Sequence, residues 1–178
     1  MLTFTGREVW TAIHGMAFGF GFILFFTAAL ALLLTLQPQL LTAKGLRRNV
    51  TLLKISGTAI AVLSWLAVIV GTYIVYPWYR AAPPKGTPDL GSFPRSRLLA
   101  NSALSGWHNF GMEWKEHLGW LVPIIATAAL FLIFRYGEKL VEEKKIRWTL
   151  FVIVCIAFVL AGIVGVLGAI ITKEAAVV

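Results

Sequence analysis

The chain has 178 residues, of which 58% are apolar and 13% are charged, and its formal net charge is +8. Soluble domains carry about 25% charged residues, so the composition excludes most soluble enzymes and predicts an integral membrane protein. The basic residues flank apolar runs instead of forming a basic helix or an aromatic-basic platform, so we expect no nucleic-acid partner.

Four apolar runs meet or approach the length of about 20 residues that a helix needs to cross a bilayer. Their hydrophobicity is continuous along the chain, which favours helices over the alternating strands of a barrel. The sequence therefore predicts an all-α, four-helix membrane bundle that forms one domain over residues 1–178. The predicted spans are residues 11–36, 55–76, 118–134 and 149–171.

Basic residues are concentrated in the first and third connections between the predicted spans. The first connection holds Lys44, Arg47, Arg48 and Lys54 with no acid, and the third holds Arg135, Lys139, Lys144, Lys145 and Arg147. Cytoplasmic loops carry this kind of excess. We therefore predict an inner or plasma membrane protein with both termini and the ~40-residue loop 77–117 on the outer, periplasmic side.

The long second loop divides into two parts. Residues 81–94 are rich in Pro and Gly and are predicted to be irregular. Ser96 is a predicted cap for a short helix. The stretch WHNFGMEWKEHLGW then leads into the third span and is predicted to be a helical extension on the outer side.

Three histidines are the main candidates for chemistry, and the predicted topology places all of them near the outer face. An ionisable residue at membrane depth is by default a functional hypothesis. Imidazoles from two helices of a bundle suit the axial positions of a b-type haem. His108 and His117 lie nine residues apart and so on opposite faces of one helix. We therefore predict one haem b held by His14 and His117, with His108 as the other possible partner of His14.

Small residues beside His14 would let a flat porphyrin approach the helix. Gly21 follows His14 by seven residues and therefore lies on the same face two turns deeper. Phe18 is predicted to pack on the ring. Gly15 and Gly19 of the same helix equally suit close packing between membrane helices.

Two other sites remain open on the outer side. His108 with Met112, and Glu113 with His117, are spaced for one helix face, so a non-haem copper or iron site is an alternative. A quinone site is also possible, because oxidation of quinol releases protons that His117 beside Glu116 would accept.

In helix count, size and the placement of His14, His108 and His117, the chain resembles the small four-helix cytochrome b-type subunits that anchor respiratory enzymes and exchange electrons with quinone. The resemblance implies an electron-transfer subunit of a larger complex, not a stand-alone enzyme. Its expected partners are other membrane subunits, quinone and an outer redox protein such as a cytochrome c. Such subunits usually carry more axial histidines, which leaves a cofactor-free accessory subunit as the runner-up.

Overall fold

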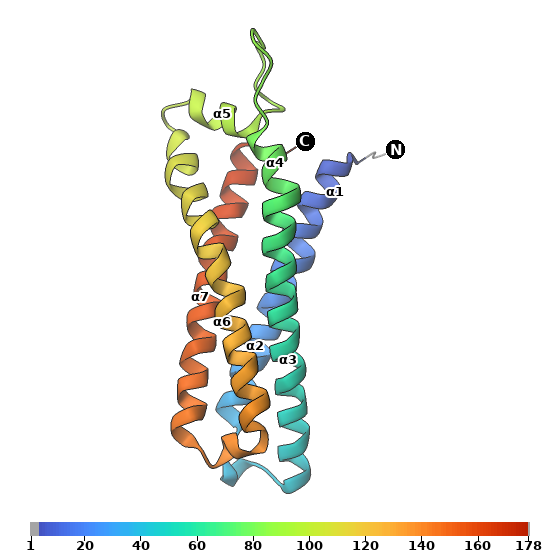
Figure 1. The fold of residues 1–178 in the computed structure, drawn as a ribbon, viewed down its shortest axis with the longest axis vertical. Coiled ribbons are helices and arrows are strands. Elements are labelled where there is room, and N and C mark those ends of the chain that lie inside the picture. The colour runs from blue at the N-terminus through green and yellow to red at the C-terminus, as the bar shows by residue number, and fades with distance from the viewer. Residues whose placement is uncertain (1–3, 178) are drawn as a thin grey trace.

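The computed structural model describes residues 4–177, and these residues form helices and connections with no strand. Four helical segments are long and apolar enough to cross a membrane, which confirms the predicted fold class (Figure 1). Each segment is longer than the apolar run within it. The segments are Gly6–Thr35, Ala43–Arg80, Trp107–Val141 and Lys144–Glu174.

The first segment consists of α1 (Gly6–Ala12), the π-helical η1 (Ile13–Phe18) and α2 (Gly19–Thr35). It begins at a capping box: the Glu8 amide donates to Thr5 Oγ1 at 3.2 Å, and the Thr5 amide donates to the Glu8 carboxylate at 2.7 Å. This reciprocal pairing satisfies two amides that the first turn leaves without partners. The helix therefore begins before the apolar run does.

The second segment is joined to the first by a short connection that contains η2 (Pro38–Leu40). Its elements are α3 (Ala43–Val70), the π-helical η3 (Gly71–Val75) and α4 (Tyr76–Arg80). Thr42 caps α3 by accepting from the Gly45 amide at 3.1 Å.

The long loop carries α5 (Pro94–Ala100), which begins two residues before the predicted cap. The Ser96 prediction is wrong because Pro94 occupies the first helical turn, where its fixed φ and missing N–H are tolerated. The last two segments are a π-helical turn η4 (Trp107–Met112) followed by α6 (Glu113–Tyr136) and η5 (Gly137–Val141), and then α7 (Lys144–Glu174).

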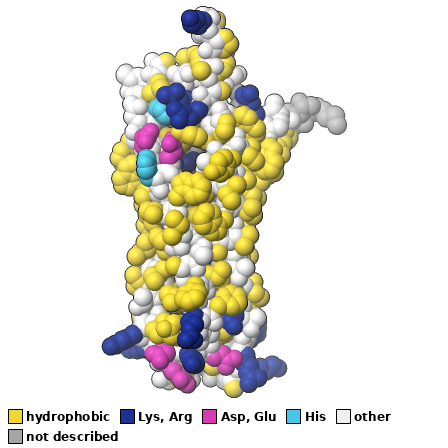
Figure 2. Space-filling model, viewed as in Figure 1, with side chains coloured by type: hydrophobic (Ala, Val, Ile, Leu, Met, Phe, Trp, Pro, Cys, Tyr) yellow, Lys and Arg dark blue, Asp and Glu magenta, His cyan; other side chains and the backbone are white. Residues whose placement is uncertain are grey.

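The four segments form a ring in which α2 contacts α3 and α7, and α6 contacts the same two helices. Both termini and α5 lie at one end of the bundle (Figure 1). We call it the histidine end, because His14 lies near the start of the first segment and His108 and His117 lie near the start of the third. The two short connections lie at the opposite end, which we call the turn end. Figure 2 shows a broad hydrophobic surface between two ends that carry Lys and Arg.

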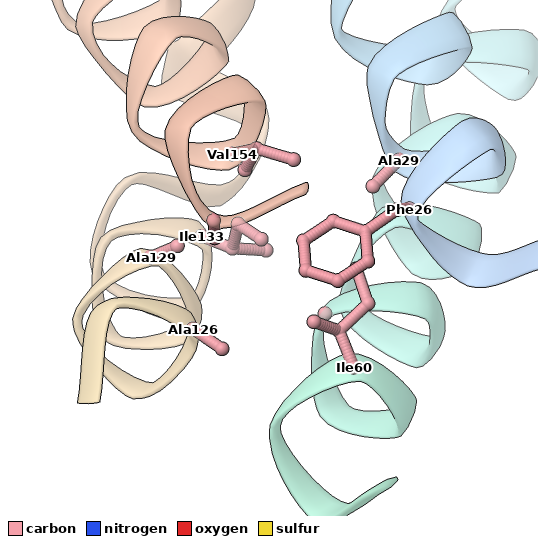
Figure 3. Close-up of a pocket in the computed structure, with 9 residues that line it drawn as sticks. Phe26, Ala29, Ile60, Ala126, Ala129, Ile133 and Val154 are labelled. Atoms are coloured by element: carbon pink, nitrogen blue, oxygen red, sulfur yellow. The ribbon is translucent and has the colours of Figure 1, made fainter. Parts of the chain in front are cut away.

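The bundle core is apolar and closely packed. Phe26 is 1% exposed and packs with Phe22 and Phe158, at ring-centroid distances of 6.2 and 5.5 Å. It borders a cavity of about 10 Å³ between the four helices (Figure 3). A cavity of this size and apolar lining stays dry. One side-chain hydrogen bond also joins α3 to α6, from Trp65 Nε1 to Thr127 Oγ1 at 3.1 Å.

Candidate functional site

Three π-helical turns interrupt the helices, and all three lie toward the histidine end: η1, η3 and η4. A π turn adds one residue to an α-helix and occurs frequently at functional sites. His14 lies within η1, His108 lies within η4, and Gly71 begins η3. The irregular backbone therefore coincides with the polar side chains of this end.

Two rows of hydrogen-bonded side chains, each containing a tyrosine, lie at the histidine end, and we call them the tyrosine relays. The first relay links Arg80, Tyr76 and Glu116. Arg80 Nη1 donates to the Tyr76 hydroxyl at 3.3 Å, and that hydroxyl donates to the Glu116 carboxylate. The Arg80 guanidinium also lies over the Tyr76 ring, 5.4 Å from its centroid. This first relay connects the end of the second segment to the first turn of α6.

The second tyrosine relay links Arg95, His108 and Tyr79. Arg95 Nε lies 3.3 Å from His108 Nε2, and His108 Nδ1 lies 2.9 Å from the Tyr79 hydroxyl. Because a guanidinium can only donate, we assign Nε2 as the acceptor and place the imidazole proton on Nδ1. His108 then donates to Tyr79, and the Tyr79 hydroxyl keeps its own proton for a further partner.

The two relays lie side by side within a small apolar cluster. The rings of Tyr76 and Tyr79 stack at a centroid distance of 6.1 Å with an interplanar angle of 16°. Tyr79 is 2% exposed and packs in a cluster with Leu98 and Ile171. The site therefore draws on α4, the long loop, η4, α6 and α7, all of which meet only in the folded bundle.

His14 faces the second segment at a position where only glycine fits. A Cβ atom at Gly71 would lie 2.7 Å from His14 Cε1, closer than any real contact. His14 Nδ1 is buried and has no hydrogen-bond partner within residues 4–177. Buried polar atoms are nearly always paired, so this nitrogen is available to a ligand.

Lys115 projects inward from α6 at the same end of the bundle. Its Nζ would lie 2.7 Å from a Cβ at Gly168 of α7, so this glycine makes room for the ammonium. Within the described residues, the Lys115 ammonium donates no hydrogen bond. Lys115 is close enough to His14 for the two side chains to interact electrostatically. A cation and an imidazole with one unpaired ring nitrogen, Nδ1, thus occupy the interior at this end of the bundle.

His117 does not join His14 in this arrangement. It is exposed, and its Nδ1 lies 2.7 Å from the Glu113 carbonyl one turn earlier. The other predicted residues are dispersed: Phe18 is half-buried in η1, Gly21 lies against Leu63 of α3, Met112 is buried and Glu113 is exposed. The haem and non-haem ligand sets both stay predictions.

Sequence reasoning missed Lys115, Tyr79, Arg80 and Arg95, although one signal was readable. Small or buried residues recur every three or four positions along α6 and mark its inner face, namely Gly119, Val122, Ala126, Ala129 and Ile133. Extending that spacing one turn back reaches Lys115. His117 falls with exposed Leu121 and Ile124 on the opposite face.

Within residues 4–177 no three His, Cys, Asp or Glu side chains gather as a metal site would require. Comparison of the chain with models of protein families, with curated protein sequences and with solved structures found no match. The candidate site is therefore defined by its own chemistry. It consists of two tyrosine relays anchored by arginines, the Lys115 ammonium and the unpaired Nδ1 of His14, all at one end of the four-helix bundle.

Proposed function

We propose that the chain is a subunit of a quinol-linked membrane electron-transfer complex and that its histidine end accepts the protons of quinol. The observation that carries this proposal is the pair of tyrosine relays beside two interior nitrogens, Lys115 Nζ and His14 Nδ1, that have no hydrogen-bond partner within the described part of the chain. Polar groups at membrane depth are costly unless they serve a ligand or a proton path.

A quinone head group has the complementary chemistry. It is flat and apolar, with two carbonyl oxygens that accept hydrogen bonds, and the Lys115 ammonium can donate one of them. Oxidation of quinol to quinone releases two electrons and two protons. The electrons pass one at a time to a one-electron redox centre of a partner subunit. Glu116, through Tyr76, accepts one proton, and water at the histidine end takes the other. Arg80 and Arg95 hold both relays in one orientation.

Photoaffinity labelling tests the quinone site. An azido-quinone added to the protein in its native membrane complex should label the histidine end, with excess unlabelled quinone suppressing the reaction. Lys115→Met should weaken labelling, because a buried hydrogen bond to the head group is lost. A photoreactive fatty acid is the control for non-specific insertion. Equal labelling of wild type and Lys115→Met, or labelling that excess quinone does not suppress, would contradict the proposal.

We also propose that the histidine end faces outward, so that the protons leave on the periplasmic side. In a Cys155→Ala background, Lys85→Cys in the long loop should react with an impermeant thiol reagent on intact cells, whereas Glu138→Cys at the turn end should react only after lysis. We place this cysteine at Glu138 and not at the neighbouring Gly137, because the φ of 49° at Gly137 favours glycine. The reverse labelling pattern would overturn the orientation.

A b-type haem is the cofactor that the sequence analysis predicts, with quinone as the further possibility. Both ring nitrogens of His108 are engaged with Tyr79 and Arg95, and His117 lies on the exposed face of α6, away from the bundle interior. His14, with its orphaned nitrogen, is the histidine that this chain offers to an iron. We therefore propose that haem in the complex takes one axial imidazole from His14 and the other ligand from a partner.

His14→Ala tests this assignment. A reduced-minus-oxidised spectrum and a pyridine haemochrome assay of the purified complex should show the loss of one b haem, while the chain still inserts and assembles. His117→Ala is the matched control, because His117 lies on the exposed face of α6, away from the bundle interior. This variant should retain full haem content. Unchanged haem in His14→Ala would remove His14 as a ligand, and a complex without haem in wild type would favour a cofactor-free subunit.

A further inference from the structure

A second cavity, which unlike the one beside Phe26 has polar groups in its lining, lies at the turn end, far along the bundle from the tyrosine relays. It has a volume of about 170 Å³ and lies between the end of α2 and the first turns of α7. Lys144, Arg147 and Gln37 supply polar groups to its lining, and Leu34, Trp148 and Phe151 supply apolar ones. No acidic side chain is among the described residues that line it.

Arg147 gives the cavity a built-in positive charge. It is 7% exposed, and its Nη1 donates to the carbonyls of Leu140 at 2.8 Å and Val141 at 2.9 Å. These bonds fix the guanidinium against the connection between α6 and α7. A guanidinium has five N–H donors, and Nε and Nη2 have no hydrogen-bond partner within residues 4–177. Donors therefore remain for an anion in the cavity.

The surroundings favour a ligand that is anionic at one end and apolar at the other. Trp148 is 45% exposed beside the cavity, at a level where amphipathic rings meet lipid head groups. Farther along α7, Val152 and Ile156 are about half exposed, at 52% and 48%, on the surface that faces the hydrocarbon. Figure 2 shows Lys and Arg together with Asp and Glu at this end of the molecule, so the basic character of the cavity comes from its own lining.

We propose that this cavity binds the phosphate group of an anionic phospholipid, with Arg147 and Lys144 as its cationic partners and the acyl chains along the exposed face of α7. Basic pockets between membrane helices are a recurrent mode of lipid head-group binding. Arg147 is the preorganised donor, and Lys144 on the same turn adds a second, mobile charge. This inference does not depend on the proposed quinol chemistry.

Lipid titration of the detergent-purified protein, followed by thermal shift and native mass spectrometry, tests the site. Phosphatidylglycerol should raise the melting temperature and remain bound, whereas phosphatidylcholine and inorganic phosphate should not. Lys144→Gln should weaken phosphatidylglycerol binding about fivefold, the effect of one cationic side chain at a membrane surface. Arg147→Met should weaken it further.

The matched control is Lys145→Gln, which removes the same charge from an exposed neighbour outside the cavity lining. It should leave lipid binding unchanged. Equal weakening in Lys144→Gln and Lys145→Gln would show diffuse surface attraction and overturn the site. An equal response to inorganic phosphate would overturn the lipid assignment, and no response of wild type to phosphatidylglycerol would overturn the proposal as a whole. Because Lys144 is exposed, its variant tests the site even if Arg147→Met fails to fold.

Discussion

Phe26→Ala is expected to lower the free energy of unfolding by about 2 kcal/mol, which is the cavity part of the cost of truncating a buried aromatic ring. Phe26 is 1% exposed, contacts the rings of Phe22 and Phe158, and already borders a small void. Dispersion contacts dominate packing within a membrane bundle, where lipid tails are as apolar as the core. The four helices that meet at this side chain cannot all close around the space it leaves (Figure 3).

The measurement is unfolding of the purified protein in lipid nanodiscs or detergent. Phe20→Ala is the matched control, because Phe20 lies in the same helix and is 73% exposed. Lipid or detergent fills the space that this exposed ring vacates, so we expect a change within about 0.5 kcal/mol. If the two variants were equally stable, the bundle core would not be packed around Phe26 as described.

If the chain serves quinol oxidation as we propose, Glu116→Gln is expected to reduce that activity of the complex about 10²-fold, the lower range for losing a positioned acid or base. Glutamine keeps the size and the hydrogen bond from Tyr76 but cannot take up a proton at neutral pH. Tyr76→Phe should give a loss in the same direction, since it disconnects Glu116 from Arg80. Steady-state quinol oxidation by the assembled complex is the measurement.

Asp89→Asn supplies the comparison for this effect. It removes the same charge from an exposed loop at the same end, where the Asp89 side chain accepts from the Gly91 amide at 2.8 Å, a bond that asparagine also makes. Its activity should match wild type. Full activity in Glu116→Gln, in protein that assembles normally, would exclude Glu116 as the proton acceptor.

The fold was predictable because the bilayer imposes a simple rule on sequence. Continuous apolar runs must become helices, and the four runs did so. Their ends were less predictable, because hydropathy reports where the hydrocarbon lies and not where backbone hydrogen bonding stops. The caps at Thr5 and Thr42 extend the helices into polar sequence. The Thr-x-x-Glu pattern at Thr5 is a readable signal for the first of them.

The site was harder to predict because its geometry depends on side-chain direction and on distant contacts. Seven residues from His14 to Gly21 do place both on the side that meets the second segment, His14 against Gly71 of η3 and Gly21 against Leu63 of α3. The tyrosine relays join residues separated by 29 and 40 positions. No local sequence pattern around either partner predicts these contacts. The π turns shift helical register by an amount that composition does not encode. Hydropathy predicts that Lys115 is a charge flanking the third span. In the structure its side chain lies inside the bundle, because Gly168 has no Cβ to occupy that space.

The two short connections at the turn end have a consequence for biosynthesis. They make the chain a pair of antiparallel helical hairpins, residues 6–80 and 107–174, tethered by the long loop. We expect each hairpin to enter the bilayer as a unit and the bundle to assemble by lateral association of the two halves. Trp65 and Thr127 belong to different halves, so their hydrogen bond forms only at that second step. The tyrosine relays also cross this seam, which means that the site is completed by the same event that completes the bundle.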